Sequence, residues 1–224
     1  MKKELVVAAY DKDLSWVSKL NDDVKVTIYR KGDVIPLSDN EILIAPNVGR
    51  CVHTFFNHIY NNYNNLSDYT FFCQDFPFDH WGNMIEIING DVGLLDKTAE
   101  LTIGGYYGYH NNTFGTAWTL HGMSPTQHHG KGSVLTCLSN GQPQDKNPSI
   151  NVDRYWGSLF NSPIPNSYEF IPGGHFTITK EHIHLRTIEF YKSVVSLLED
   201  DINSPWIIER LECYIFNSLY KTKI

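Results

Sequence analysis

The chain of 224 residues is predicted to fold as one α/β domain with a mostly parallel sheet flanked by helices. Glu4 to Tyr10 is a continuous apolar run, which is typical of a central strand covered on both faces. Val24 to Tyr29 predicts a second strand, and Leu14, Val17 and Leu20 lie between the two runs at helical spacing. The order strand, helix, strand is the usual opening of a parallel α/β sheet.

A long amphipathic helix is expected to follow, with Asn47 as its N-cap. Apolar side chains recur at positions i, i+3, i+4 and i+7 from Val48 to Tyr63. Arg50 lies in the first turn, where the helix dipole disfavours a cation. Two interpretations stay open: Arg50 turns to solvent, or an anion binds beside it, because helix N-termini attract phosphate.

A third buried strand is predicted from Tyr69 to Cys73, and it ends in a cluster of polar side chains. Gln74 and Asp75 follow directly, and the pair Asp79 and His80 comes a few positions later. Ligands of α/β sheets bind just past the carboxyl ends of strands, and carboxylate oxygens can hold a hard cation there. The alternative is that Asp75 only caps a turn or a helix.

The second half of the chain is expected to complete the same domain, so that residues 1–224 form one unit. Residues 90–148 are rich in Gly, Asn, Ser, Thr and His, and loops of this length are usually functional, which suggests a lid or acceptor-binding region. Helices are expected at Val152–Phe160, Lys180–Leu185, Ile188–Leu198 and Ser204–Phe216, and strands at Tyr168–Ile171 and His175–Thr179.

Composition narrows the classes of function. A hydrophobic share of 42% with 19% charged residues is that of a globular protein, and the net charge of −7 argues against broad attraction to nucleic acid or anionic membrane. No run approaches the roughly 20 apolar residues of a membrane span, so no membrane partner is expected. The four scattered cysteines form no CxxC pair and are interpreted as reduced thiols of a cytoplasmic protein.

None of the common nucleotide-binding or hydrolase motifs occurs in the chain. Four segments instead carry a resemblance: Val6 to Trp16 (VVAAYDKDLSW), Pro46 to His80, Gly173 to Ile183 (GGHFTITKEHI) and Trp206 to Phe216 (WIIERLECYIF). In this order they resemble an uncharacterised domain family whose members are similar to glycosyltransferases of the GT-A fold. The resemblance implies a nucleotide-sugar donor, a hydroxyl acceptor and a divalent cation, Mn²⁺ or Mg²⁺.

The resemblance also implies a role for each polar residue. The spacing from Asp75 to Asp79 departs from the DxD motif of such enzymes, which leaves metal dependence open. The base that deprotonates the acceptor would be Asp79 or Glu209. The expected donor-binding residues are Tyr10, Asp11, Tyr29, Asn47, Arg50 and Gln74; those for the acceptor are Trp81 and Trp206; those for the metal are Asp75, Asp79, His80 and His175.

Two other functions are compatible with the same fold. The first is a non-catalytic protein that binds a nucleotide sugar or carbohydrate. The second is an enzyme that glycosylates hydroxymethylpyrimidine bases in DNA, which would need a local basic patch. The residues available for such a patch are Lys12, Lys19, Lys25, Arg30 and Lys31. The sugar, the acceptor and the stereochemical outcome stay open.

Overall fold

The structure is a computed structural model that describes residues 1–31, 41–44, 47–79, 82–90, 108–109, 118–119, 127–130, 134–135, 150–170, 175–216 and 222. The principal strands are β1 (Lys3–Ala9), β2 (Val24–Arg30), β3 (Glu41–Leu43), β4 (Tyr69–Gln74) and β11 (Phe176–Thr179). Shorter strands are β5 (Gly108–Tyr109), β6 (Trp118–Thr119), β7 (Gln127–Gly130), β8 (Val134–Leu135), β9 (Ile150–Asn151) and β10 (Ser167–Phe170). The helices are α1 (Arg50–Asn62), α2 (Met84–Asn89), α4 (Val152–Leu159), α5 (Lys180–Ile183), α6 (Ile188–Asp200) and α7 (Ser204–Ile215), with 3₁₀ turns η1 (Ser15–Lys19), η2 (Tyr63–Asn65) and η3 (Pro77–Asp79).

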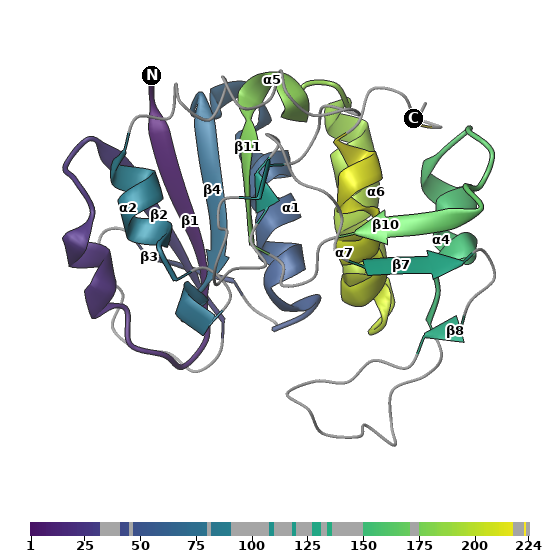
Figure 1. Cartoon of the computed structure of the whole chain (residues 1–224), viewed down its shortest axis with the longest axis horizontal. Coiled ribbons are helices and arrows are strands. Elements are labelled where there is room, and N and C mark those ends of the chain that lie inside the picture. The colour runs from purple at the N-terminus through teal and green to yellow at the C-terminus, as the bar shows by residue number, and fades with distance from the viewer. Residues whose placement is uncertain are drawn as a thin grey trace.

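The main sheet is mixed, with strand order β3-β2-β1-β4-β11-β6-β5 (Figure 1). The neighbouring strands β3, β2, β1 and β4 are parallel, which confirms that part of the expected sheet. β11 is antiparallel to β4, so the sheet is not parallel throughout. The expected loop region at 90–148 lies mostly outside the described residues.

The order of the strands creates a topological switch point at β1. The chain passes from β1 outward to β2 and β3, and it then returns through α1 to form β4 on the other side of β1. The carboxyl ends of β1 and β4 therefore meet where the winding reverses. Open α/β sheets bind their ligands at this place.

Helices cover both faces of the sheet, as the continuous apolar run of β1 predicts. Val6 and Ala8 pack in the core shared with α1, α6 and α7. Leu5 and Val7 pack on the opposite face in the core shared with α2 and Trp16. Figure 1 shows α2 in front of the sheet and α1 behind it. The later predicted helices and strands are also found, within a few residues of their expected ends.

Two local predictions were wrong. The segment between β1 and β2 forms the 3₁₀ turn η1 in place of an α-helix. Asn47 is not the N-cap of α1: Gly49 takes that position with φ 62°, and its carbonyl accepts the first helical hydrogen bond from His53 at 2.9 Å. A Cβ at Gly49 would lie 2.5 Å from the Cβ of His53, so this turn requires glycine.

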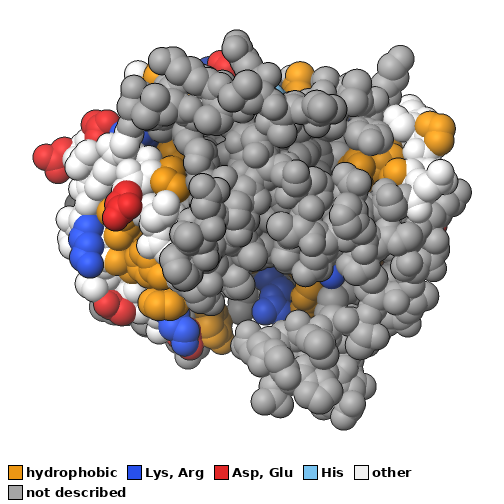
Figure 2. All heavy atoms as spheres, in the orientation of Figure 1, with side chains coloured by type: hydrophobic (Ala, Val, Ile, Leu, Met, Phe, Trp, Pro, Cys, Tyr) orange, Lys and Arg blue, Asp and Glu red, His pale blue; other side chains and the backbone are white. Residues whose placement is uncertain are grey.

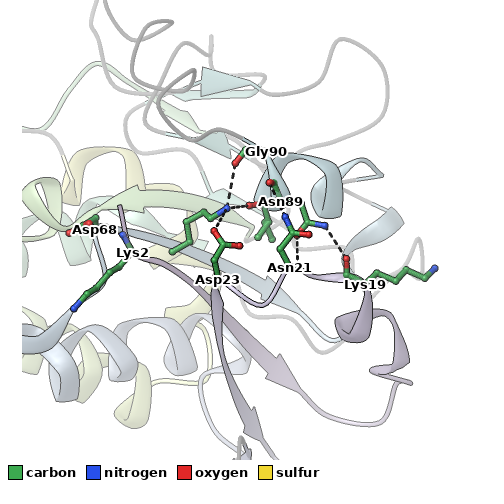
Figure 3. Close-up of polar contacts among 9 residues, drawn as sticks. Lys2, Lys19, Asn21, Asp23, Asp68, Asn89 and Gly90 are labelled. Atoms are coloured by element: carbon green, nitrogen blue, oxygen red, sulfur yellow. Dashed lines mark hydrogen bonds and ion pairs between the residues drawn. The ribbon is translucent and has the colours of Figure 1, made fainter.

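Polar contacts fix α2 at the amino end of β1 (Figure 3). The ammonium of Lys3 donates to the Ile88 carbonyl at 3.0 Å and pairs with Asp23 at 3.1 Å. The positive charge of Lys3 interacts favourably with the negative, carboxyl-terminal end of the α2 helix dipole. Asn21 and Asn89 add a hydrogen bond from the Asn21 N–H to the Asn89 side chain at 2.8 Å.

A buried polar cluster lies at the same end of the sheet, against α1. The Glu4 carboxylate accepts hydrogen bonds from Lys25 and Thr27, both at 2.8 Å, and from Ser67 at 3.1 Å. His58 Nε2 lies 3.6 Å from the same carboxylate. Burial lowers the pKa of His58 to about 4, so its imidazole is neutral at pH 7.

This cluster predicts a loss of stability in mild acid. Between pH 6.5 and 5 the unfolded chain protonates His58 while the folded chain does not, so the free energy of unfolding should fall by about 1–2 kcal/mol through this residue. The measurement is urea denaturation at several pH values, and His58→Gln should flatten the dependence. An equally steep dependence in that variant would show that other groups cause it.

Candidate functional site

A cavity of about 760 Å³ opens at the switch point, which is the size range of sites for small molecules. Its walls come from the carboxyl ends of β1 and β4, the residue after β2, the first turn of α1, and the corner between α6 and α7. Figure 2 shows basic and hydrophobic side chains together in a hollow at the lower middle of the drawn face.

Several of the residues predicted to form the donor, acceptor and metal sites line this cavity. Asp11 lies next to it and is joined to its wall through the hydrogen bond from the Asp11 N–H to Asp75 at 3.1 Å. The cavity thus lies past the carboxyl ends of β1 and β4, and its use as a ligand site stays a prediction. The predicted residues in its wall are Tyr10, Asn47, Arg50, Gln74, Asp75 and Trp206.

Other predicted site residues lie elsewhere. Tyr29 is buried in the core, and its hydroxyl bonds His58 Nδ1 at 2.8 Å, so it does not hold a ligand in this cavity. His175 is completely buried and is not part of the cavity wall. Glu209, on α7, is also outside the wall, although its charge adds to desolvation in raising the pKa of the Cys51 thiol. The side chain of Asp79 and the whole of His80 and Trp81 lie outside the described residues.

Asp75 makes contacts that differ from its expected role as a metal ligand. Its Oδ2 accepts hydrogen bonds from three consecutive backbone N–H groups, those of Tyr10 at 2.9 Å and of Asp11 and Lys12 at 3.1 Å. Its Oδ1 accepts from the Phe76 N–H at 3.1 Å, and the side chain is only 9% exposed. Successive N–H groups of this kind form an anion-binding nest, and here the anion is the protein's own carboxylate.

The described residues do not fit the expected divalent cation. Four backbone N–H groups already use the oxygens of Asp75, and His175 is buried away from the cavity. Among the residues that the structure describes, no group of three or more His, Cys, Asp or Glu side chains is placed to hold a metal ion. The metal site stays a prediction that depends on Asp79 and His80.

Two cations lie in the cavity wall. Arg50 is exposed, and its guanidinium carbon lies 5.0 Å from the centroid of the Trp206 ring, in a cation–π contact. Lys31 is only 3% exposed, and its ammonium donates to the carbonyls of Val48 at 2.6 Å and of Arg50 at 2.7 Å. Burial lowers the pKa of Lys31 to about 8.

Sequence reasoning missed Lys31 as a site residue and counted it only in a basic surface patch. Its position directly after β2, beside the central strand, was the signal that could have found it. The patch itself is not formed as expected. Lys25 pairs with the buried Glu4 at the amino end of β2, whereas Lys31 is buried past the carboxyl end of that strand.

The fold and the cavity define an α/β protein with a ligand-sized site at the switch point of a mixed sheet. The chain belongs to the family described as Protein of unknown function (DUF3431), whose model matches residues 5–223. No curated protein and no solved structure matches the chain. Among the helices in the described part of the chain, none is long and apolar enough to cross a bilayer.

Proposed function

We propose that the protein transfers a sugar from a nucleotide-sugar donor, bound in the cavity, to a hydroxyl acceptor. The observation that carries the proposal is the position of the cavity at the switch point, where two cations and aromatic side chains share one wall. A nucleotide sugar combines the groups that such a wall can bind: a charged diphosphate, a planar base and hydroxyl-rich rings.

The residues of the wall suit different parts of this donor. Arg50 and the start of α1 would meet the diphosphate, because both offer positive charge and N–H donors. Tyr10 and Trp206 offer aromatic faces, and the amides of Asn47 and Gln74 can bond hydroxyl groups. In the reaction the acceptor oxygen bonds to the anomeric carbon while the bond from that carbon to the diphosphate oxygen breaks.

Charge and proton movements follow from this step. The leaving diphosphate gains negative charge, which the cations of the wall stabilise. The acceptor hydroxyl gives its proton to a base, for which Asp79 is the proposed residue because it ends η3, which begins two residues after the cavity-lining Asp75. Glu209 is less suited to this role, since it does not line the cavity.

The test is a thermal-shift screen of nucleotide sugars, each with and without Mn²⁺. A donor at 100 times its Kd should stabilise the protein by about 2.7 kcal/mol, and it should raise the Tm more than the same nucleotide with a different sugar. A panel covering uridine, guanosine, adenosine and cytidine donors that leaves the Tm unchanged at millimolar concentration would contradict the proposal.

A second candidate is a non-catalytic protein that binds the same donor. The contacts of Asp75 favour this second candidate. Its carboxylate was expected to bind the metal, but it accepts hydrogen bonds from four backbone N–H groups instead. Hydrolysis of the bound donor separates the two. A transferase should release nucleoside diphosphate slowly in the absence of an acceptor, whereas a binding protein should return the donor intact.

A further inference from the structure

Building on the proposed function, we propose that Lys31 and Arg50 supply the positive charge that opposes the ligand's diphosphate, in place of a divalent cation. The proposal assigns Lys31, which no motif singles out, to the binding site. It also fixes where the diphosphate lies, against the turn that precedes α1.

The surroundings of Lys31 favour an anionic partner. Its ammonium has two carbonyl acceptors. Among the residues that the structure describes, no carboxylate lies within ion-pair distance of this ammonium. A buried charge without an opposite charge is costly in free energy, and carbonyl dipoles offset only part of that cost. An anion in the cavity would supply the missing opposite charge.

The backbone beside Lys31 is held in an unusual conformation. Gly49 and Arg50 both have left-handed backbone, with φ 62° and 52°, and Arg50 is not a glycine. Lys31 binds the carbonyls on either side of Gly49, so it holds this turn together. Strain of this kind persists where the surrounding structure enforces it, most often at functional sites.

The strained turn brings three positive features to one wall. It places the Arg50 guanidinium over Trp206 and presents the first turn of the 13-residue helix α1 to the cavity, next to Lys31. The other backbone anion site nearby, the N–H groups of residues 10–12, is already filled by Asp75. The diphosphate is therefore directed to the α1 side of the cavity.

A consequence for proton binding follows. With its pKa lowered to about 8 by burial, Lys31 is about half neutral at pH 8 in the free protein. A bound diphosphate favours the ammonium form, so binding at pH 8 should take up part of a proton. The other titratable or charged groups near Lys31 are Cys51 and His53 on α1, Arg50, Asp75, and Glu199 and Asp200 on α6.

The experiment is calorimetric titration of the whole protein with inorganic pyrophosphate in the presence of EDTA. Measurement at pH 8 in two buffers of different ionisation enthalpy gives the number of protons exchanged. We expect binding without metal, with proton uptake by Lys31 at pH 8 measured as the difference between the wild type and Lys31→Met, because the titration of pyrophosphate itself contributes to both. No difference in proton uptake at pH 8, or binding that requires Mn²⁺, would overturn the proposal.

Variants of single lysines test whether Lys31 causes the binding and the proton uptake. Lys31→Met should weaken pyrophosphate binding tenfold or more and abolish the proton uptake by Lys31, while Lys192→Met, the same change at an exposed position of α6, should alter neither. Lys31→Gln keeps a side chain that can bond the two carbonyls and serves if the Met variant does not fold. Proton uptake that is unchanged in a folded Lys31 variant would assign it to another group and sink the proposal.

The same titrations separate this proposal from the proposed function. Pyrophosphate that binds with proton uptake while no nucleotide sugar stabilises the protein would keep the charge assignment and reject glycosyl transfer. Nucleotide sugars that bind only with Mn²⁺ and without proton uptake would reject the charge assignment to Lys31 and leave glycosyl transfer in place.

Discussion

Replacing Asp75 with alanine should lower the free energy of unfolding by roughly 3–5 kcal/mol, the largest effect that we expect of any single change at the site. The variant would leave four backbone N–H groups without their acceptor, in a place where Asp75 itself is only 9% exposed. These bonds join the end of β1 to the end of β4, so their loss loosens the switch point itself. Urea denaturation of the pure proteins is the measurement.

Two further variants make the test specific. Asp75→Asn keeps one acceptor oxygen and should lose clearly less stability than alanine. Asp11→Ala removes a neighbouring exposed carboxylate whose one ion pair within the described part of the chain is with Lys12, so it should change stability by no more than about 0.5 kcal/mol. If Asp75→Ala stayed as stable as the wild type and lost only ligand binding, Asp75 would be a ligand-binding residue after all.

Changes at Arg50 should affect binding far more than stability. Alanine removes the guanidinium and should weaken binding of a diphosphate by about 1.5–3 kcal/mol, the range for hydrogen bonds that involve charged groups. It also removes the contact with Trp206, which is worth about 0.5–1 kcal/mol at an exposed site. Lysine should recover only part of the affinity, because it cannot form the planar bidentate pair.

The backbone of Arg50 supplies a second comparison. Its φ of 52° is strained for alanine but free of strain for glycine, so Arg50→Gly should be more stable than Arg50→Ala by about 1 kcal/mol. Both variants should bind the diphosphate equally weakly. The measurements are melting temperatures together with calorimetric affinities. Stability lost with affinity unchanged would place the anion site away from Arg50.

Much of the fold was predictable because burial leaves a local pattern in the chain. The unbroken apolar run of β1 predicted a strand covered on both faces, and the helical spacing after Val48 predicted α1. The antiparallel β11 was not predictable, because a short apolar strand reads the same in either direction. The start of α1 was missed because its cap is a left-handed glycine and not the nearby asparagine.

The position of the cavity was predictable, but the contacts of the residues around it were not. Ligands gather past the carboxyl ends of strands beside a switch point, so strand ends in the sequence indicated the cavity. The roles of single polar residues depend on partners that lie far away in the chain. Asp75 binds residues 10–12, and Lys31 binds Val48 and Arg50 across a turn, so no local spacing could reveal either contact.

Local patterns of apolar and polar residues were thus enough to define the α/β class, the central strands and the end of the sheet where the cavity opens. They could not tell a carboxylate that binds a ligand from one that binds the backbone, since both follow a strand and both are acidic. That distinction depends on which donors fold against the side chain. For Asp75 the donors are the protein's own N–H groups, and the ammonium of Lys31 in turn donates to the protein's own carbonyls.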